Sequence, residues 1–545
     1  MKKKPLLLGS MLTTMVVLLA ACGSNSSSSS KSQSMTRMVK DVIQTMDPAQ
    51  ATDVISGQTL QDTTAGLLRF KGKNLEPDLA SKKPTVSKDQ KTYTFTIRKG
   101  AKWSDGKEIT AQDFVYSWER AADPKTKSEY SYIFSGIKNA DDIIAGKKDP
   151  STMGVKAEGK YKLVVTLDRV MPYFQKMITL QTFNPVEKSV VKKYGSKFGT
   201  ASKYITASGP YKLTNWNGSN NTWTEVKNKS YWNAKNVKLD KIKTTVVKDT
   251  STAVNLFQSN KLDDAVISGD TATQMKNDKS YKTMVQGRTT YLEMEQKKVP
   301  AFKNQKIRQA LSLSINRTQF INKVLGDGSR PVYTILPYKS MYNSDGTDIA
   351  AAATKGVKHY NDYDLSKAKQ LFKEGMKEAG LTSFSFTITS DDTDAAKSTT
   401  EYLQNAFEKL SSSDAKVTVK TKSVPFKTRI TLSEQHNFDM VVSGWQGDFP
   451  DAISFLDLET TGNSYNFGQW SNAEYDKYVQ ASKTTDATST SKRWDDLVKA
   501  TQILAKDNGV IPLYQTGEAH LTNTKISNYD YGPNNMIDME SVTKK

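Results

Sequence analysis

The chain has a single cysteine, Cys22, among its 545 residues. One cysteine excludes a disulfide within the chain, and also a zinc or iron–sulfur site that needs several thiolates. Histidine is almost as rare: His359, His436 and His520 lie far apart, and no two have the spacing of metal ligands on one helix turn. We therefore expect no metal site and no cofactor.

Sequence motifs of common catalytic sites are also missing. There is no Gly-x-Ser-x-Gly, His-Glu-x-x-His or Walker sequence. Residues 343–348 (NSDGTD) resemble the start of a calcium loop but lack the glutamate that ends one. Asp448 and Asp451 form a pair of carboxylates of the type glycosidases use, without a second acidic element to support it. The sequence does not predict an enzyme.

Only one long apolar run occurs, at residues 6–21, behind the cations Lys2, Lys3 and Lys4. It is too short for a membrane span and typical of an exported protein's signal peptide. It ends in LAACG, and small residues directly before a cysteine resemble the lipobox of bacterial lipoproteins. We expect residues 1–21 to be removed and Cys22 to carry lipid on the outer face of the cell membrane; the alternative is a plain signal peptide. Residues 22–35 are serine-rich and predict a flexible tether.

The charge is strongly positive, at +20 for the whole chain and +17 for residues 22–545. Such an excess of positive charge is typical of proteins that bind nucleic acid. Here, however, the lysines are scattered and no basic helix or aromatic–basic motif is present. An exported protein of this charge is also compatible with anionic lipids and wall polymers. We favour the second interpretation and expect no nucleic acid partner. The length is sufficient for about three domains.

Hydrophobic periodicity predicts a mixture of helices and strands. Tyr93, Phe95 and Ile97 alternate with threonines, which predicts a half-buried strand. Thr110 followed by Asp113 predicts a capped helix start. Further predicted elements are helices near 59–67, 306–325 and 365–379, a hairpin turn at 217–218, a strand at 241–247, and a strand–helix–strand unit at 384–388, 403–410 and 417–424. This last unit predicts parallel strands and therefore an α/β fold.

Residues 438–458 (FDMVVSGWQGDFPDAISFLDL) contain the best candidate site. A buried-looking strand runs into Gly444, Trp445, Gly447 and Asp448. Glycines let the backbone approach a ligand closely, and a carboxylate beside an aromatic ring suits an ammonium group. The alternative is that Asp448 caps the turn before Pro450 and that Trp445 is ordinary core.

Several segments together resemble one protein family. They are residues 97–106 (IRKGAKWSDG) with 110–118 (TAQDFVYSW), 46–53, 207–213 (ASGPYKL), 307–312 (IRQALS) and the loop 438–458. In order and spacing they are similar to the oligopeptide and dipeptide class of extracellular solute-binding proteins, the receptors of ABC peptide importers. The resemblance covers nearly all of the chain after the predicted signal peptide. It places the family's N-terminal strand at 46–53.

The resemblance implies an α/β, periplasmic-binding-protein-like fold with two lobes, a hinge and an extra domain. Domain I would be discontinuous (36–65, 195–293 and 512–545), with domain II at 66–194 and domain III at 294–511. Crossings near residues 293 and 512 would serve as the hinge. The partners implied are peptides and the membrane permease of an ABC transporter, and we expect a monomer.

The resemblance also implies roles for individual residues. Asp448 falls where the family binds the ligand's α-ammonium, residues 444–447 would offer backbone donors and acceptors, and Trp445 would line a side-chain pocket. Val54 matches the opposing strand. The best-known short-peptide members hold the ligand's carboxylate with cations that here correspond to Ser433 and Val442, both uncharged.

This departure raises the hypothesis that the protein does not hold the ligand's carboxylate at these positions and binds longer peptides or one specific signalling peptide. A receptor of this family for another solute, such as a haem, a sugar or a metal chelate, and an exported hydrolase remain alternatives.

Overall fold

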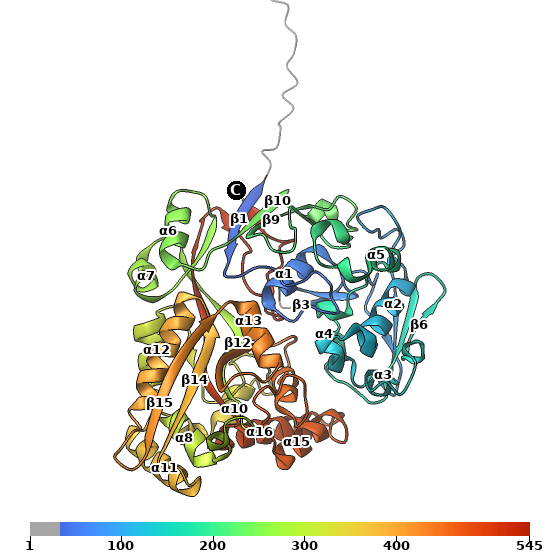
Figure 1. Ribbon diagram of the computed structural model, residues 1–545. Coiled ribbons are helices and arrows are strands. Elements are labelled where there is room, and N and C mark those ends of the chain that lie inside the picture. The colour runs from blue at the N-terminus through green and yellow to red at the C-terminus, as the bar shows by residue number, and fades with distance from the viewer. Residues whose placement is uncertain (1–32, 73) are drawn as a thin grey trace, which may run out of the picture. The chain divides into compact units, whose positions relative to one another are not determined.

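The structure, a computed structural model, describes residues 33–72 and 74–545 (Figure 1). The predicted signal peptide, Cys22 and most of the predicted tether lie outside the described residues. The first strand, β1 (Ser34–Val39), starts inside the tether predicted for 22–35. Met35 is fully buried, and β1 pairs in parallel with β10 from Ser34↔Lys241 onward, so Ser34 and Met35 belong to the large sheet rather than to a tether.

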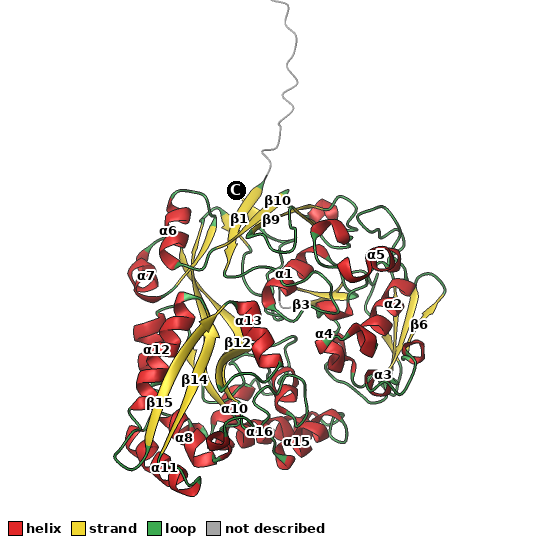
Figure 2. Ribbon diagram, viewed as in Figure 1, coloured by secondary structure: helices red, strands yellow, loops and turns green. Residues whose placement is uncertain are grey.

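The largest sheet contains 11 strands drawn from distant parts of the chain. Its main path is, in spatial order, β15 (Lys416–Val424), β14 (Ser383–Asp391), β16 (Met440–Gln446), β12 (Tyr281–Met294), β17 (Val510–Thr522), β11 (Asp264–Ile267), β1, β10 (Lys241–Val246), β9 (Thr222–Lys227) and β8 (Tyr211–Thr214), with β13 (Arg330–Pro331) beside β17. The sheet contains both parallel and antiparallel pairs of strands (Figure 2).

The other sheets are smaller. A four-stranded sheet has the order β4 (Thr85–Val86), β5 (Thr92–Thr96), β7 (Lys162–Thr166) and β6 (Val155–Glu158), and two pairs join β2 (Leu68–Lys71) to β3 (Asn74–Pro77) and β18 (Ile526–Ser527) to β19 (Thr543–Lys544).

The helices are α1 (Val54–Thr63), α2 (Ala111–Ala122), α3 (Ala140–Ile144), α4 (Phe174–Met177), α5 (Lys188–Tyr194), α6 (Thr250–Gln258), α7 (Gly269–Gln274), α8 (Gln305–Leu313), α9 (Arg317–Phe320), α10 (Ile349–Thr354), α11 (Leu365–Glu378), α12 (Asp394–Glu408), α13 (Phe426–Glu434), α14 (Ile453–Leu456), α15 (Ala473–Lys483) and α16 (Thr490–Asp507).

Several predicted elements are confirmed. The strand–helix–strand unit is β14–α12–β15, whose two strands pair in parallel from Ser383↔Lys416 to Asp391↔Val424. Helix α2 starts directly after Thr110, where the Asp113 carboxylate accepts a hydrogen bond from the Thr110 N–H at 2.8 Å. This reciprocal cap satisfies backbone donors that a helix start would otherwise leave unpaired.

Two predictions near the N-terminus are wrong. Residues 46–53 form a turn and a loop rather than the expected strand, and the helix expected at 59–67 is α1, five residues earlier at its start. The cause is Asp53, whose Oδ1 accepts hydrogen bonds from the Ile55 and Ser56 N–H groups at 3.0 and 2.8 Å and so starts the helix there. Val54 is consequently the first residue of α1 and not part of a strand.

Strands β12 and β17 run side by side in the large sheet and carry the two predicted crossings. Tyr291 pairs with Pro512, and Glu293 pairs with Val510. β12 also pairs with β16 along its other edge. The candidate segment 438–458 is therefore attached through β16 to β12, which carries one of the two predicted hinge crossings.

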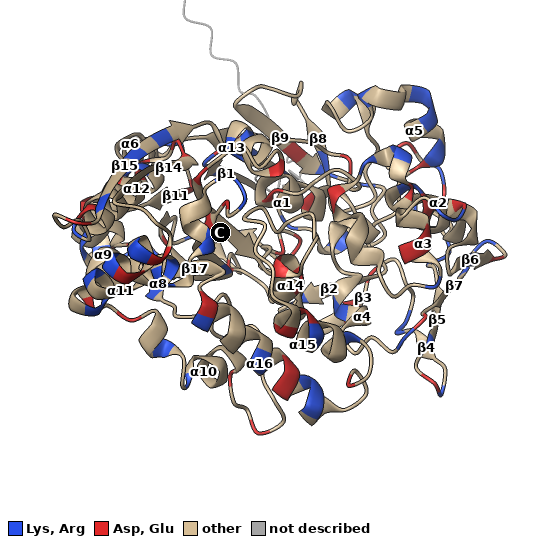
Figure 3. Ribbon diagram, turned by 60° about the horizontal axis from the view of Figure 1, so that its bottom comes forward, with Lys and Arg blue, Asp and Glu red and all other residues tan. Residues whose placement is uncertain are grey.

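The distribution of charged residues and the lengths of the helices concern possible contact with nucleic acid or with a membrane. Figure 3 shows Lys and Arg spread over many elements and interspersed with Asp and Glu. Among the helices described here, none combines the length and the apolar character that a membrane span requires.

Candidate ligand-binding site

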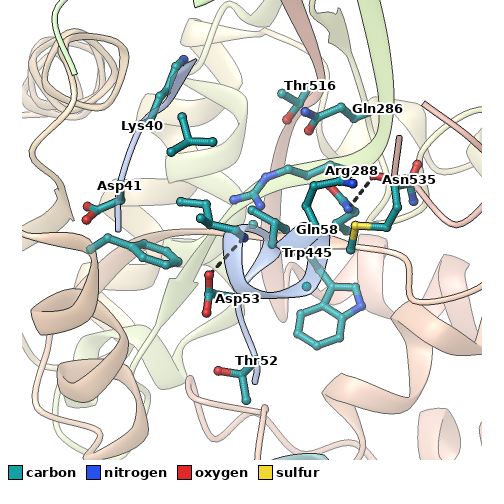
Figure 4. A pocket seen from close by; sticks show the side chains of 18 of the residues that line it. Lys40, Asp41, Thr52, Asp53, Gln58, Gln286, Arg288, Trp445, Thr516 and Asn535 are labelled. Atoms are coloured by element: carbon teal, nitrogen blue, oxygen red, sulfur yellow. Dashed lines mark hydrogen bonds between the residues drawn. The ribbon is translucent and has the colours of Figure 1, made fainter. Parts of the chain in front are cut away.

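A cavity of about 400 Å³ brings together all five residues predicted to bind a ligand. They are Val54, Gly444, Trp445, Gly447 and Asp448. Its walls also include Tyr130, strands β12 and β17, helix α13 and the segment 534–537 (Figure 4). Residues almost 500 positions apart in the chain thus form one site.

Strand β16 forms a wall of this cavity and has one edge that is only partly paired. Its whole length pairs with β12, from Met294↔Met440 to Arg288↔Gln446. On its other side β14 pairs with Met440 and Val441 alone. Within the described part of the chain, residues 442–446 thus have no strand on that side. A free strand edge offers its backbone groups to an extended chain.

The two predicted glycines make room for the protein's own side chains. A Cβ atom on Gly444 would lie 2.6 Å from the Arg288 Nη2, and one on Gly447 would lie 2.8 Å from the Phe455 ring. The Gly447 N–H donates to the Gly287 carbonyl at 3.1 Å, and its carbonyl accepts from Asn535 Nδ2 at 3.1 Å. The Gly447 N–H is therefore used inside the protein rather than left free.

Asp448 is a buried carboxylate, with 9% of its surface exposed. Its Oδ1 accepts a hydrogen bond from the Tyr130 hydroxyl at 3.0 Å, and its Oδ2 accepts one from the Ser454 hydroxyl at 3.3 Å. No Lys, Arg or His of residues 33–72 and 74–545 forms an ion pair with it. Burial raises the pKa of Asp448 to about 7, although both hydrogen bonds oppose the rise.

These contacts differ from those of a turn cap. Tyr130 lies 318 residues from Asp448 in sequence, and the hydrogen bonds found for this carboxylate come from hydroxyl groups, not from backbone N–H groups of the turn. The Asp448 N–H donates to Ser454 Oγ at 2.9 Å, which fixes the loop. The carboxylate is held by side chains of the cavity wall.

Asp451, the other carboxylate of the candidate pair, has a different environment. Both of its oxygens bind the Arg493 guanidinium, at 2.7 and 3.0 Å, and the two side chains are buried. A carboxylate held by a bidentate arginine is a structural anion and a poor acid or base. The pairing of Asp451 with Arg493 thus argues against a catalytic pair of the glycosidase type.

An aromatic cluster of Tyr130, Tyr132, Trp445 and Tyr465 surrounds this end of the cavity. The Trp445 ring stacks on Tyr130 at 6.1 Å between centroids and meets Tyr465 edge-on at 5.0 Å. Trp445 is 8% exposed, and its indole Nε1 has no acceptor among the described residues. The cluster holds the Tyr130 hydroxyl against Asp448 and offers ring faces to a cation.

The sequence analysis missed several residues of the cavity. Tyr130 gave no signal, because its role depends on a contact across 318 residues. Arg288 and Arg429 also line the cavity, whereas Ser433, the uncharged position that was examined, is fully buried. Arg429 lies one helical turn before Ser433 on α13. The sequence signal that could have found this cation is an arginine four residues before Ser433.

Comparison with known proteins identifies the family. Residues 74–467 match the family described as bacterial extracellular solute-binding proteins, family 5. The dipeptide-binding protein of Lactococcus lactis is 34% identical over 503 residues, covering 90% of this chain and 90% of the relative. The periplasmic oligopeptide-binding protein OppA of Salmonella typhimurium is 31% identical, covering 91% and 90%.

A solved structure agrees with these matches. Listeria monocytogenes OppA bound to peptide has a TM-score of 0.88 and 34% identity, covering 95% of this chain and all of that chain. The structural likeness confirms the predicted periplasmic-binding-protein-like fold. By sequence and by fold, the chain belongs to family 5 of the bacterial extracellular solute-binding proteins.

Proposed function

We propose that this protein is an extracellular receptor that binds peptides in the described cavity and delivers them to an ABC importer. The observation that carries the proposal is the buried Asp448 carboxylate, which belongs to the cavity wall and has no cation of its own among the described residues. The matched proteins of Lactococcus lactis and Salmonella typhimurium are named as dipeptide- and oligopeptide-binding, and the Listeria monocytogenes structure holds a peptide.

The ligand's α-ammonium group would bind Asp448. A carboxylate taken out of water is destabilised unless a countercharge is supplied, and its raised pKa reflects that cost. An entering ammonium supplies the charge and further hydrogen bonds. The faces of Trp445 and Tyr130 add cation–π attraction.

The ligand's backbone would lie along residues 442–446 of β16. Peptides share a backbone and differ in side chains, so a receptor of broad range needs directional bonds to the backbone. The unpaired edge of β16 offers such bonds, and Val54 at the start of α1 lines the same cavity. Side chains would occupy the remaining space, where water supplies missing hydrogen bonds.

Other functions receive less support. Neither Asp448 nor Asp451 belongs to a catalytic pair, which argues against an exported hydrolase, and we propose that the protein is not an enzyme. A haem, sugar or metal chelate needs no buried carboxylate that awaits a cation. A signalling peptide satisfies Asp448 as well as a nutrient peptide does.

The first prediction concerns Asp448→Asn, which keeps the shape of the side chain and removes its charge. Loss of one partner of a buried, hydrogen-bonded charge pair costs about 2–5 kcal/mol, or roughly 30- to 4,000-fold in affinity. We expect calorimetry to show such a loss for peptides with a free amino terminus. N-acetylated forms of the same peptides should bind the wild type weakly and lose much less on mutation.

Equal losses for free and acetylated peptides would show that Asp448 does not bind the amino terminus. Asp451→Asn is a poor control because it breaks the pair with Arg493. Asp345→Asn, at an exposed loop outside the cavity, makes the same chemical change and should leave both affinities unchanged. Mass spectrometry of the same samples should recover intact peptides, whereas a hydrolase would leave cleaved ones.

We further propose that the chain has the three domains given above, with the ligand bound as lobes close about β12 and β17. The Tyr130–Asp448 hydrogen bond joins the proposed domains II and III, as does the bond from Lys176 Nζ to the Pro450 carbonyl at 3.2 Å. Both contacts would form on closure. Hinges of this kind act where few strands cross between lobes.

The second prediction is that peptide reduces the radius of gyration measured by small-angle scattering. The ligand-free protein would sample an open form, and saturation with peptide would shift it to the closed one. The Asp448→Asn variant at the same peptide concentration serves as the control for incomplete binding. An identical radius in ligand-free and fully saturated wild type would contradict closure.

We also propose that the protein is a monomer held at the outer face of the membrane by lipid on Cys22. Residues 19–23 and the serine run that follows them support the lipid anchor. The third prediction is that a fatty-acid analogue supplied to cells labels the wild type and not Cys22→Ala. No other cysteine exists to be modified in its place. Equal labelling of the variant would rule out the lipobox.

A further inference from the structure

We propose that Arg288 and Arg429 form a carboxylate-binding subsite in the cavity that holds Asp448. The inference rests on the proposed function, because it assigns the second charged group of the same peptide ligand. The carboxylate would belong either to the peptide's C-terminus or to an acidic side chain. The uncharged Ser433 and Val442 positions do not provide such a subsite.

Arg288 is a cation of the cavity wall without an anion. It comes from β12, next to Gly287 and opposite Gln446 of β16. Its guanidinium forms no ion pair and no hydrogen bond within residues 33–72 and 74–545. Figure 4 shows its side chain in the middle of the pocket, with Trp445 and Asp53 on one side and Gln286 and Thr516 on the other.

Two arginines that are more deeply buried than the partly exposed Arg288 have carboxylate partners within the protein. Arg37 binds Asp62 and Glu225 at 2.8 and 3.0 Å, and Arg493 binds Asp451 through both carboxylate oxygens. A guanidinium removed from water needs hydrogen-bond partners, because an unpaired buried charge is costly, and these partners are carboxylates for Arg37 and Arg493 and mainly backbone carbonyl groups for Arg317. The chain meets this requirement for Arg37 and Arg493 but not for Arg288. A ligand anion would meet it.

Arg429 extends the positive surface from a second element. It lies on α13 and is 4% exposed, and its Nε donates to Asp391 Oδ1 at 2.9 Å. No hydrogen bond involves its two Nη atoms in the described part of the chain. Burial lowers the pKa of Arg288, and the Arg429 charge lowers it further, as expected for two cations close together.

Two acidic groups near Arg288, Asp391 and Glu518, already have partners. Asp391 is paired with Arg429. Glu518 accepts a hydrogen bond from the Tyr531 hydroxyl at 2.8 Å, and the His520 Nε2 lies 3.4 Å away. Neither comes within ion-pair distance of Arg288. A carboxylate entering the cavity would therefore meet donors that are free, and arginine binds carboxylates through two parallel bonds.

Gly444 fixes where this subsite lies relative to the ligand. Because a Cβ atom there would be 2.6 Å from Arg288 Nη2, the guanidinium lies directly against the backbone of β16. That position is on the strand whose edge would bind the peptide backbone, four residues before Asp448. The loop after β16 thus carries an anion and a cation of β12 lies against the middle of β16, which matches a ligand with an ammonium and a carboxylate.

The fourth prediction tests this subsite with synthetic peptides of three, five and seven alanine and valine residues, all with free amino termini. Each is made as a free acid and as a C-terminal amide, and a second set of amides carries either Glu or Gln at its central position. We expect Arg288→Gln to weaken the matching carboxylate peptide by about 30-fold or more and its neutral counterpart by much less. Loss confined to free acids identifies the C-terminus, and loss confined to Glu peptides identifies a side chain.

Controls separate this inference from the proposed function. Arg330→Gln makes the same chemical change at an exposed position outside the cavity and should alter no affinity. Arg288→Lys keeps the positive charge but lacks the planar guanidinium that binds a carboxylate through two bonds. It should therefore retain part of the preference for carboxylate peptides over their neutral counterparts. If the wild type binds none of these peptides, the proposed function fails and the subsite fails with it. If the wild type binds these peptides but Arg288→Gln lowers the affinity for all of them by the same factor, whether they are free acids, amides, Glu peptides or Gln peptides, then the subsite alone is refuted.

Discussion

A buried carboxylate without a cation is the constraint on which the binding site depends. Asp448 receives two hydroxyl hydrogen bonds, which orient it but do not neutralise it. Its pKa of about 7 measures how far burial has destabilised the ionised form. Three residues further on, Asp451 is buried to a similar degree and binds Arg493. The contrast shows that this fold can pair a buried aspartate, and it supports our proposal that the ligand supplies the cation for Asp448.

Strand β12 and its neighbours arrange the charged groups around that carboxylate. β16 runs from β12 into the Asp448 loop, and Arg288 of β12 lies against β16 because Gly444 has no side chain. Tyr130 approaches from a distant part of the chain and joins Trp445 in the aromatic cluster. The result is a cavity with an acidic end and a cationic wall along one partly unpaired strand. In our proposal such an arrangement selects for an extended molecule with charges of both signs and leaves its other side chains loosely specified.

Local patterns predicted what depends on neighbouring residues. The Thr110–Asp113 cap and the parallel β14–β15 unit follow from spacing alone, and both are present. Asp448 and Trp445 were predicted from a strand that ends in glycines, and both line the cavity. Val54 was placed wrongly because the Asp53 cap starts a helix where a strand was expected. Tyr130 and Arg288 could not be predicted, since each gains its role from a contact between residues far apart in the chain. The domain boundaries stay a prediction.

The central claim is that the ligand supplies the missing cation to Asp448, and the pKa of this carboxyl tests it most directly. Carbon-13 resonances of the aspartate carboxyl groups can be titrated by NMR, with Asp448→Asn identifying the signal. Without ligand we expect a pKa of about 7. With saturating free-amine peptide it should fall to about 4 or below, as an ammonium stabilises the ionised form. A pKa that stays near 7 while the peptide is bound would contradict the account.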